Sequence, residues 1–475
     1  MRETRSSLPS PGERRLYEDA DSLISAALRA VEPCRLVEAA LEGRPPQPAG
    51  ELVVISVGKA ARAMAEGARR VLGSQIGEGI LLLPRRTPGA IPEGFATFPC
   101  GHPLPDQGSL NGSRAVLEAA RRAHATDLVL LLISGGASAC LTLPQEGISL
   151  DDLRETTDLL LKAGALIQEV NAVRKHLDRL KGGQMARAAA PASILALLLS
   201  DVPGDLPDVI GSGPVSPDNS TFADASDVLK RYGLWERVPD SVRRHVERGL
   251  ERQVPDTPKE AEPDFDRVQL RVIGNSATAV GAARREAERR GYRTIVLSTE
   301  LTGEARAVGS RLAGRARELR EARGMTAPPT CVLAGGETTV TVIGGGRGGR
   351  NQELALSAAL VLDGLENVLV ASVGTDGVDG PTDAAGARAT GSTVNRARSN
   401  GLDPAEHLAS NDAYPLFRVL DDLILTGPTG TNVSDLMMVL VGDSAGDSEQ
   451  RADPERGGRT GRGDPVSGAD GSAPR

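Results

Sequence analysis

Short runs of consecutive apolar residues recur along the chain, each followed by glycine or polar residues and then by a segment with helical spacing. The clearest runs are Leu52–Val57, Asp127–Ile133, Ser193–Leu199 and Val368–Val373. Apolar runs of this length, bounded by turn residues, are typical of strands buried on both faces of a parallel sheet. Segments such as Leu16–Glu42 and Ser109–His124 carry apolar residues three and four positions apart and predict helices. The alternation of strands and helices predicts an α/β fold.

At 475 residues the chain is long enough for two hydrophobic cores. We predict two α/β domains, a Rossmann-like N-terminal domain with a parallel sheet and a second C-terminal domain, flanked by disordered ends. The expected bounds are 1–14 for the disordered N-terminus, 15–255 for the first domain, 268–441 for the second and 442–475 for the disordered tail. A right-handed strand–helix–strand crossover is expected to open the second domain, through Arg271–Ile273, Ala277–Arg290 and Thr294–Leu297.

Charge and composition narrow the class of protein. The net charge of −8 argues against a nucleic-acid partner, because no basic face dominates. The four cysteines are widely spaced and form no metal-binding pair, which is typical of buried thiols in a reducing cytosol. The N-terminus lacks an apolar signal segment, and no stretch reaches the about 18 apolar residues of a membrane span. We therefore expect a cytoplasmic protein that acts on a small molecule, without a membrane partner.

Two turns of special composition follow predicted strands, where open α/β sheets place their ligands. Lys59 comes directly after Leu52–Val57 and Gly58, although the phosphate-loop signature GxxxxGK[ST] is absent. A lysine that merely begins a helix is the alternative for Lys59. Ser134, Gly135, Gly136 and Ser138 follow the next strand; such a turn forms a backbone nest for a carboxylate or phosphate, or is an ordinary tight turn.

Charged residues gather in three further segments. Asn171–Leu177 contains Arg174 and Lys175, and Lys181 follows with two glycines, so this region is either a substrate-facing loop or a solvated face. Asp201 follows Ser193–Leu199 in a loop shaped by proline and glycine, which suits a general base or a metal ligand. The segment after Val368–Val373 has three aspartates that predict a divalent-cation site or a set of turns: Asp376, Asp379 and Asp383.

The segment Gly335–Glu353, GGETTVTVIGGGRGGRNQE, combines a strand pattern, a glycine cluster and a helix start. We expect Thr338–Ile343 to be a strand, because β-branched residues alternate there. Glycines before a helix let backbone N–H groups approach a phosphate, and Arg350 can add a bidentate contact. Three of the glycines also satisfy GxGxxG, but two arginines interrupt that loop and the next acidic residue lies beyond the usual about 20 positions.

Taken together, these segments resemble the glycerate 2-kinase family with a MOFRL C-terminal domain, over nearly the whole chain from about Leu16 to Val441. The matching segments are Ser56–Ala61, Gly101–Asp106, Leu132–Ala139, Asn171–Ala186, Ser200–Asp205, Gly211–Asp218, Gly335–Val342, Gly346–Glu353, Val373–Ala387 and Thr426–Leu436. The resemblance implies ATP-dependent phosphorylation of D-glycerate to 2-phosphoglycerate in a cleft between two α/β domains, with the MOFRL region at about 330–438. It also implies that Lys59, Asp201 and Arg350 are catalytic or substrate-binding. Ala137 and Asp178 depart from the family pattern, which commonly has glycine and serine there.

These roles combine into one hypothesis, because phosphoryl transfer requires charge neutralisation and alignment more than covalent chemistry. Lys59 and Arg350 neutralise phosphates, and Asp201 accepts the proton of the glycerate hydroxyl. The nest and Arg174 or Lys175 hold the glycerate carboxylate. Contacts to ATP are expected from Gly346, Gly348, Gly349, Asn351 and Lys181, and contacts to Mg²⁺ from Asp376 and Asp379. The sequence leaves a homodimer open.

Two other functions compete with the kinase reading. The GxGxxG pattern allows an NAD(P)H-dependent oxidoreductase similar to hydroxypyruvate reductase, a label that members of this family have also carried. A non-catalytic nucleotide-binding or sensing protein is the other alternative, although the joint presence of Lys59, Asp201 and Arg350 counts against it. An ATP-consumption assay with D-glycerate and NADH-linked controls separates all three.

Overall fold

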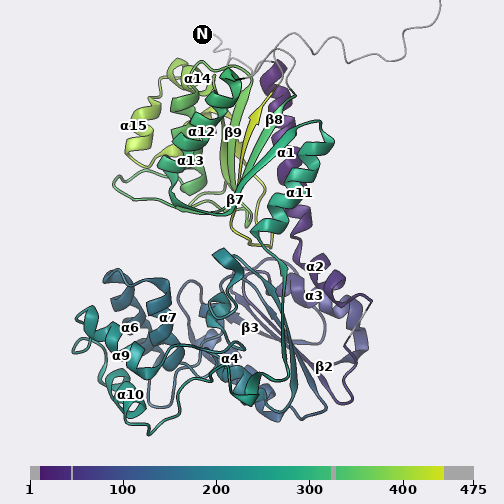
Figure 1. Ribbon diagram of the computed structural model, residues 1–475, viewed down its shortest axis with the longest axis vertical. Helices are drawn as coiled ribbons and strands as arrows, with labels where there is room; N and C mark the ends of the chain where they lie inside the picture. The colour runs from purple at the N-terminus through teal and green to yellow at the C-terminus, as the bar shows by residue number, and fades with distance from the viewer. Residues whose placement is uncertain (1–10, 44–45, 323–327, 443–475) are drawn as a thin grey trace, which may run out of the picture.

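The computed structural model describes residues 11–43, 46–322 and 328–442, which fold into two lobes with one six-stranded sheet each (Figure 1). The expected α/β class is confirmed. Of the disorder predicted for the chain ends, residues 1–10 and 443–475 lie outside the described residues. Disorder was wrongly expected at Pro11–Arg14, because helix α1 (Pro11–Ala30) already begins at Pro11. Within the described ranges, no helix is both long and apolar enough to cross a membrane.

The sheet of the first lobe is parallel throughout, in the order β3-β2-β1-β4-β5-β6. Its strands are β1 (Leu52–Val57), β2 (Ile76–Pro84), β3 (Phe95–Cys100), β4 (Leu128–Ile133), β5 (Ser193–Leu199) and β6 (Val268–Gly274). The helices that cover its two faces are α2 (Pro33–Leu41) and α3 (Ala61–Leu72) on one side, and α4 (Gln107–Arg122) and α8 (Gln184–Ala189) on the other. Because side chains of β1 point alternately to α3 and α4, both faces are buried, which explains the unbroken apolar runs.

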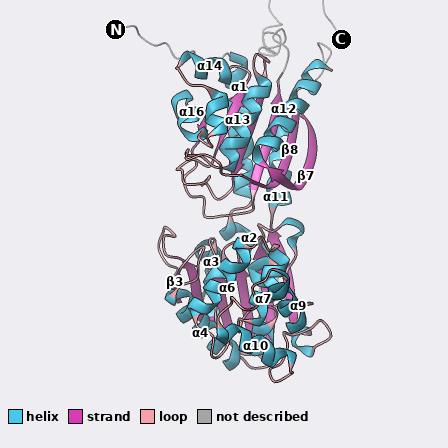
Figure 2. Ribbon diagram, turned by 90° about the vertical axis from the view of Figure 1, so that its left-hand side faces the viewer, coloured by secondary structure: helices cyan, strands magenta, loops and turns pink. Residues whose placement is uncertain are grey.

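Four helices form a separate cluster beside this sheet, with its own apolar core (Figures 1 and 2). They are α6 (Leu150–Lys162), α7 (Ile167–His176), α9 (Phe222–Arg231) and α10 (Asp240–Leu250). Short helical turns complete the first lobe at α5 (Ala137–Cys140), Gly73–Gln75, Pro203–Asp205, Ile210–Ser212 and Pro263–Phe265. The cluster places α7 beside the carboxyl ends of β4 and β5.

The sheet of the second lobe is mixed, in the order β11-β10-β9-β12-β8-β7, and only β7 and β8 run parallel. Its strands are β7 (Arg293–Glu304), β8 (Thr330–Thr339), β9 (Val368–Gly374), β10 (Gly386–Thr390), β11 (Leu423–Ile424) and β12 (Asp435–Val441). Helices α1 and α11 (Ser276–Arg289) cover one face, and α12 (Ala305–Glu321) and α13 (Arg350–Leu362) cover the other. The remaining helices are α14 (Thr393–Ser399), α15 (Pro404–Ala409) and α16 (Ala413–Leu420).

The strand, helix and strand expected at the start of the second domain are present as β6, α11 and β7, but the expected crossover is wrong, because β6 and β7 belong to different sheets. Strand β6 pairs with β5 and completes the first sheet, and α11 then carries the chain to the second lobe (Figure 1). The first helix, α1, also packs in the second lobe, against α11 and β9, whereas α2 returns to the first. Two passages of the chain therefore connect the lobes near the site, at the α1–α2 turn and at the β6–α11 turn.

Of the strand expected at Thr338–Ile343, only Thr338 and Thr339 are confirmed, because β8 begins earlier and ends at Thr339. Its partner β7 ends at Glu304, opposite Thr339, so the next residues have no strand with which to pair. The N–H of Thr341 instead donates to the Glu304 carboxylate at 2.9 Å. The side chains of Val342 and Ile343 point away from the core, 74% and 69% exposed.

Candidate active site

Lys59 lies where the first lobe faces the second. Gly58 turns the chain after β1 with φ +115, and a Cβ there would lie 2.5 Å from the Ser134 carbonyl oxygen, so only glycine fits. The N–H of Lys59 donates to the Gly135 carbonyl at 2.8 Å. Its Nζ lies 3.5 Å from Oδ2 of Asp376, which follows β9 of the second lobe. The carboxyl ends of β1 and β9 are thus joined by an ion pair across the two lobes.

The Ser134–Ser138 turn after β4 is held mainly by its own contacts. The Ser134 hydroxyl accepts from the Ala60 N–H at 3.0 Å and donates to the Val57 carbonyl at 3.3 Å, so it fixes the turn that carries Lys59. The Ser138 hydroxyl lies 3.0 Å from that of Ser212. Ser134, Gly135 and Ala137 are buried, so the turn is accessible mainly at the half-buried Gly136 and Ser138.

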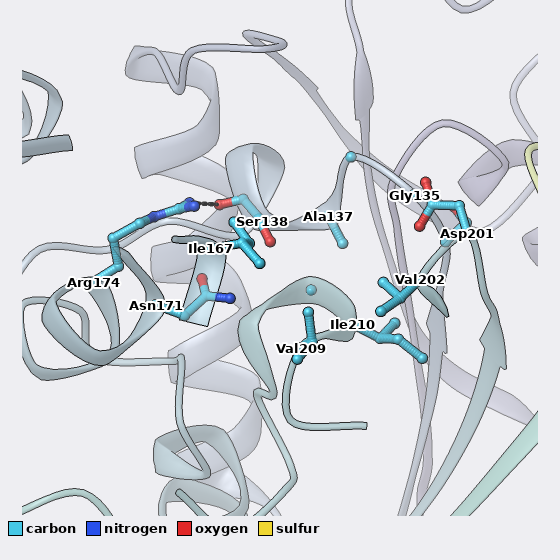
Figure 3. Close-up of a pocket in the computed structure, with 13 residues that line it drawn as sticks. Gly135, Ala137, Ser138, Ile167, Asn171, Arg174, Asp201, Val202, Val209 and Ile210 are labelled. Carbon is cyan, nitrogen blue, oxygen red and sulfur yellow. Dashed lines mark hydrogen bonds between the residues drawn. The ribbon is translucent and has the colours of Figure 1, made fainter. Parts of the chain in front are cut away.

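This turn forms one wall of a cavity of about 170 Å³ in the first lobe (Figure 3). That volume is below the ~300–1,000 Å³ of sites for drug-sized ligands, so the cavity suits a small metabolite. Asp201 and Gly135 lie at one end and Arg174 and Asn171 at the other. The lining residues are Ser134, Gly135, Gly136, Ala137, Ser138, Ile167, Asn171, Arg174, Asp201, Val202, Val209, Ile210 and Gly211.

Arg174, on α7, brings a cation to this cavity. Its Nη2 donates to the Ser138 carbonyl at 3.1 Å, and its buried Nε has no hydrogen-bond partner among the described residues. Burial lowers the pKa of the guanidinium, and Asp178 partly offsets this. Lys175 points elsewhere: its Nζ lies 3.2 Å from Asp218, and the residue is 4% exposed. Of the two cations considered for the carboxylate, only Arg174 lines the cavity.

Lys181 lies inside the first lobe and not at this cavity. It is 1% exposed, and its Nζ donates to the Leu141 carbonyl, to the Thr142 hydroxyl at 3.1 Å and to the Asp178 carboxylate at 2.8 Å. Burial lowers the pKa of Lys181 from 10.5 to about 8, against the opposing effect of Asp178. Asp178 also accepts from the N–H of Leu143 and of Leu180, so this departure from the family pattern supplies a buried counter-charge.

Asp201 follows β5 and lines the cavity with a half-buried carboxylate. Its Oδ2 accepts from the Asn432 side chain at 2.7 Å, and its backbone carbonyl accepts from the Ser434 hydroxyl at 3.0 Å. Burial raises the pKa of Asp201, Lys59 opposes the rise and Asp376 adds to it. Asp201 also lines a second cavity of about 130 Å³ between the lobes.

Arg350 is the first residue of α13 and belongs to the second lobe. Its Nε and Nη2 donate to the two oxygens of Asp435 at 2.6 and 2.9 Å, and its Nη1 lies 3.1 Å from Glu337. Burial of the guanidinium lowers its pKa, but the hydrogen bonds and the charge of Asp435, together with the charges of Glu337 and Asp379, outweigh this and raise it. Asp435 pairs in the sheet with Gly374, and a Cβ on Gly374 would lie 3.3 Å from Asp376 Oδ1 and 3.5 Å from Asp435 Oδ1. Arg350 and Lys59 therefore contact carboxylates at neighbouring strand ends, Asp435 at the start of β12 and Asp376 after the end of β9.

The start of α13 is capped by the protein itself. The buried Asp379 carboxylate accepts from the N–H groups of Asn351 and Gln352 at 3.1 and 2.9 Å. A Cβ on Gly349 would lie 2.3 Å from Asp379 Cγ, so close approach requires that glycine. The position where a phosphate was expected to meet the helix is thus occupied by a carboxylate.

The glycine cluster before α13 uses several of its N–H groups in the same way. The side-chain oxygen of Asn411 accepts from Ile343 and Gly344, and the Ser410 carbonyl accepts from Gly346 at 3.1 Å. The Asp412 carboxylate accepts from the Arg347 N–H at 2.8 Å. Gly346, Gly348 and Gly349 thus lie against residues 379–380 and 410–413 of their own lobe.

The residues at the site fit a magnesium ion only in a limited way. In the described ranges, no group of three or more His, Cys, Asp or Glu residues forms a metal site. Asp379 is committed to α13, whereas Asp376 is half-buried and keeps a long contact to Lys59. Mg²⁺ commonly binds through one or two carboxylates together with substrate phosphates and water. The carboxylate of Asp376 fits an ion that arrives with a phosphate and not an all-protein cage.

Three residues at the site were given no role by the sequence. The ring of His102 lies about 3 Å from where a Cβ on Gly136 would be, and partial burial and then Lys59 lower its pKa. Asn432 and Ser434 contact Asp201 from the other lobe. The motif Thr426–Leu436 was part of the resemblance, but a single sequence does not indicate that this loop contacts Asp201 at the end of β5.

Comparisons with known proteins agree over most of the chain. A family model described as "Domain of unknown function (DUF4147)" matches residues 19–247, and the MOFRL family model matches residues 330–435. The D-glycerate 2-kinase of Thermotoga maritima is 40% identical over 422 residues, which cover 89% of this chain and 97% of the relative. The glycerate 2-kinase of Pyrococcus horikoshii is 40% identical over 434 residues, with the same two coverages. A crystal structure of the T. maritima glycerate kinase matches with a TM-score of 0.83 and 40% identity, covering 90% of this chain and 100% of that one.

Proposed function

This chain belongs to the glycerate 2-kinase family, and on that premise we propose that it transfers the γ-phosphoryl group of ATP to the 2-hydroxyl of D-glycerate. One observation carries the proposal. Beside a cavity of metabolite size that Asp201 lines, Lys59 acts on Asp201 and contacts Asp376 of the other lobe, and Arg350 binds Asp435 on a strand next to the one that Asp376 follows. Phosphoryl transfer requires this combination of positive charge for the phosphates and a base for the attacking hydroxyl.

The cavity gives D-glycerate an orientation. Arg174 lies at one end with an unsatisfied buried Nε, and a carboxylate is the natural partner for such a group. Asn171 and the Gly135–Ser138 backbone add polar contacts along the wall. A carboxylate at Arg174 directs the rest of this short molecule toward Asp201 at the opposite end.

Asp201 is the base in this proposal. Its burial raises the pKa above the ordinary value for aspartate, and a base with a higher pKa takes a hydroxyl proton more readily. Among the side chains of the described residues, only that of Asn432 donates a hydrogen bond to this carboxylate. Asn432 is neutral and binds Oδ2, so Oδ1 of Asp201 is left to accept the proton.

Lys59 and Arg350 supply positive charge from opposite lobes. The Lys59 side chain is 35% exposed and its 3.5 Å contact to Asp376 is long, so it can turn to a phosphate oxygen. The guanidinium of Arg350 is fixed by Asp435 and keeps its charge. Mg²⁺, when bound, neutralises phosphate charge, and Asp376 is the residue that we propose as its protein ligand. In this proposal Asp379 does not bind Mg²⁺ and Lys181 does not bind ATP; both residues stabilise the fold.

The proposal also covers the cellular location of the protein and its assembly state. We place the protein in the cytoplasm, because the four cysteines, all buried, are free thiols, as in a reducing compartment, and because the donor is ATP. A homodimer is the assembly that we propose. Analytical ultracentrifugation tests it, and a monomeric mass at micromolar concentration would reject it.

The function is tested by ADP release with D-glycerate, with NADH oxidation in the presence of hydroxypyruvate as the control. We expect glycerate-dependent ADP release and no NADH oxidation. Lys59→Ala, Arg350→Ala and Asp201→Asn are each expected to lower kcat on the order of a hundredfold or more. NADH-dependent reduction of hydroxypyruvate without ADP release would replace the kinase by an oxidoreductase. Wild-type kcat in any of the three variants would remove that residue from the mechanism.

A further inference from the structure

One loop of the second lobe reaches into the first lobe beside the proposed base. It comprises residues 426–434, between β11 and β12, and we call it the bridging loop. Its Asn432 donates from Nδ2 to Oδ2 of Asp201 at 2.7 Å, and its Ser434 hydroxyl donates to the Asp201 backbone carbonyl at 3.0 Å. The Thr431 hydroxyl donates to the Val31 carbonyl at 2.7 Å, at the turn between α1 and α2.

The bridging loop is anchored in its own lobe to the segment that carries Asp376. The N–H of Thr429 donates to the Asp376 carbonyl at 3.2 Å, and its hydroxyl donates to the Thr375 carbonyl at 2.5 Å. The Val433 N–H donates to the Thr375 hydroxyl at 2.9 Å. The loop therefore connects the residue that faces Lys59 with the residue proposed to take the proton.

The first lobe is shaped around the contact between Asp201 and Asn432. A Cβ on Gly135 would lie 2.2 Å from Asp201 Oδ2 and 3.1 Å from Asn432 Nδ2. Gly135 has no positive φ, so space and not backbone conformation requires glycine there. The wall of the glycerate cavity thus leaves room for one particular hydrogen bond between the lobes.

We propose that Asn432 is a positioning residue that prepares Asp201 as the base, and that it does so only when the two lobes are in contact. This inference rests on the proposed function, because it gives Asn432 a role in that reaction. The amide holds Oδ2 and leaves Oδ1 to accept the proton from the glycerate hydroxyl. The hydroxyl oxygen then forms its bond to the γ-phosphorus while the bond to the β–γ bridging oxygen breaks and ADP leaves.

A neutral amide suits this task better than a cation. A lysine or arginine at position 432 would stabilise the ionised carboxylate and weaken it as a base. The charged groups that act on Asp201 are Lys59 and Asp376, with opposite effects on its pKa. The hydrogen bond from Asn432 fixes the carboxylate and also lowers its pKa, but less than Lys59 does. When the lobes separate, the hydrogen bond breaks, and Asp201 loses its fixed orientation together with the Asp376 segment.

The test uses Asn432→Ala and Asn432→Asp in the full-length protein, with Thr426→Val as the matched control at the exposed start of the same loop, where the hydroxyl donates to the neighbouring Gly427 carbonyl. Asn432→Ala is expected to lower kcat about a hundredfold, because a base misplaced by about 1 Å loses that much, while KM for ATP changes less than about threefold. Asn432→Asp places a second carboxylate against Asp201, and the two share one proton. The acid limb of the kcat profile should therefore move up by more than one pH unit. Thr426→Val should keep the wild-type kcat and pH profile.

The result that overturns the inference is a wild-type kcat and an unshifted acid limb in both Asn432 variants. A lower melting temperature with an unshifted profile also overturns it, because that outcome marks a merely structural contact. Asn432→Asp is nearly isosteric, so it decides the matter even where Asn432→Ala does not fold. Asp201→Asn separates this failure from that of the proposed function. An active Asp201→Asn enzyme removes the base itself, whereas an inactive one with normal Asn432 variants removes only the role of Asn432.

Discussion

Replacing Gly135 with alanine tests how tightly the cavity wall fits Asp201. The added Cβ would lie 2.2 Å from Asp201 Oδ2, about 1 Å inside an ordinary contact, and 3.1 Å from Asn432 Nδ2. Because the wall is buried, Asp201 has to move. A displacement of about 1 Å lengthens its 2.7 Å bond to Asn432 beyond hydrogen-bond range. We expect kcat to fall about a hundredfold, which corresponds to about 2.7 kcal/mol of barrier.

The assay is ADP release at saturating ATP and D-glycerate, with the melting temperature measured in parallel. Gly314→Ala on α12 is the matched control, since nothing lies within 4 Å of its added Cβ and its φ is not positive. Alanine there should stabilise the helix by about 0.5–1 kcal/mol and leave kcat unchanged. If Gly135→Ala keeps the wild-type kcat, the reasoning about Asp201 is refuted. If it raises only KM for glycerate, Gly135 contacts the substrate and does not shape the base.

Four further variants test other parts of the structure. Lys181→Met leaves a buried carboxylate without its charge partner and should cost about 3–5 kcal/mol in urea unfolding; an unchanged midpoint would contradict the buried pair. The pKa of His102 is lowered by partial burial and by the neighbouring cation of Lys59. Lys59→Met should therefore raise this pKa in an NMR titration, and an unchanged pKa would show that Lys59 does not act on His102. Asp376→Asn should raise the Mg²⁺ concentration needed for half-maximal activity. Asp379→Ala should lower the melting temperature, because it leaves two buried N–H groups of α13 without an acceptor; the reverse pattern would exchange the roles of the two aspartates.

The strands that build the first lobe could be predicted because both of their faces are buried. Runs such as Leu52–Val57 carry apolar residues at every position, and helices cover both sides of the sheet. Strand β6 lies at the edge of that sheet, and Val272 is 39% exposed. Its sequence therefore does not state which sheet it joins, since pairing with β5 is a contact between distant segments. The α/β class could be predicted from local sequence patterns. The placement of α1 in the second lobe and of β6 in the first could not.

The same distinction holds for the site. Lys59, Asp201 and Asp376 follow buried strands, so the rule that ligands bind at the carboxyl ends of strands placed them near one another. Lys181 was predicted to contact ATP from its place beside two glycines, but a sequence does not give the direction of a side chain, and this one points into the core. Asn432 was not predicted as a site residue, because its contact to Asp201 joins a loop of one lobe to a strand end of the other.

The glycine cluster before α13 shows what a motif leaves open. Its glycines predicted a phosphate cradle, but Asn411 and Asp412 already accept hydrogen bonds from that backbone. Glycine is required at Gly349 because Asp379 comes so close that a Cβ would lie 2.3 Å from its Cγ. A small residue permits close approach by a ligand or by the protein itself, and the sequence does not distinguish between them.

The central claim is that Asp201 and the cations of both lobes direct ATP to the 2-hydroxyl of D-glycerate. The most direct measurement is ³¹P NMR of the product formed by the wild-type protein from ATP and D-glycerate, with the Asp201→Asn protein run beside it. We predict a single phosphate monoester coupled to the proton on C2, which is 2-phosphoglycerate, and no product from the variant. A resonance coupled to the C3 protons, equal turnover by Asp201→Asn, or inorganic phosphate as the only product would contradict the claim.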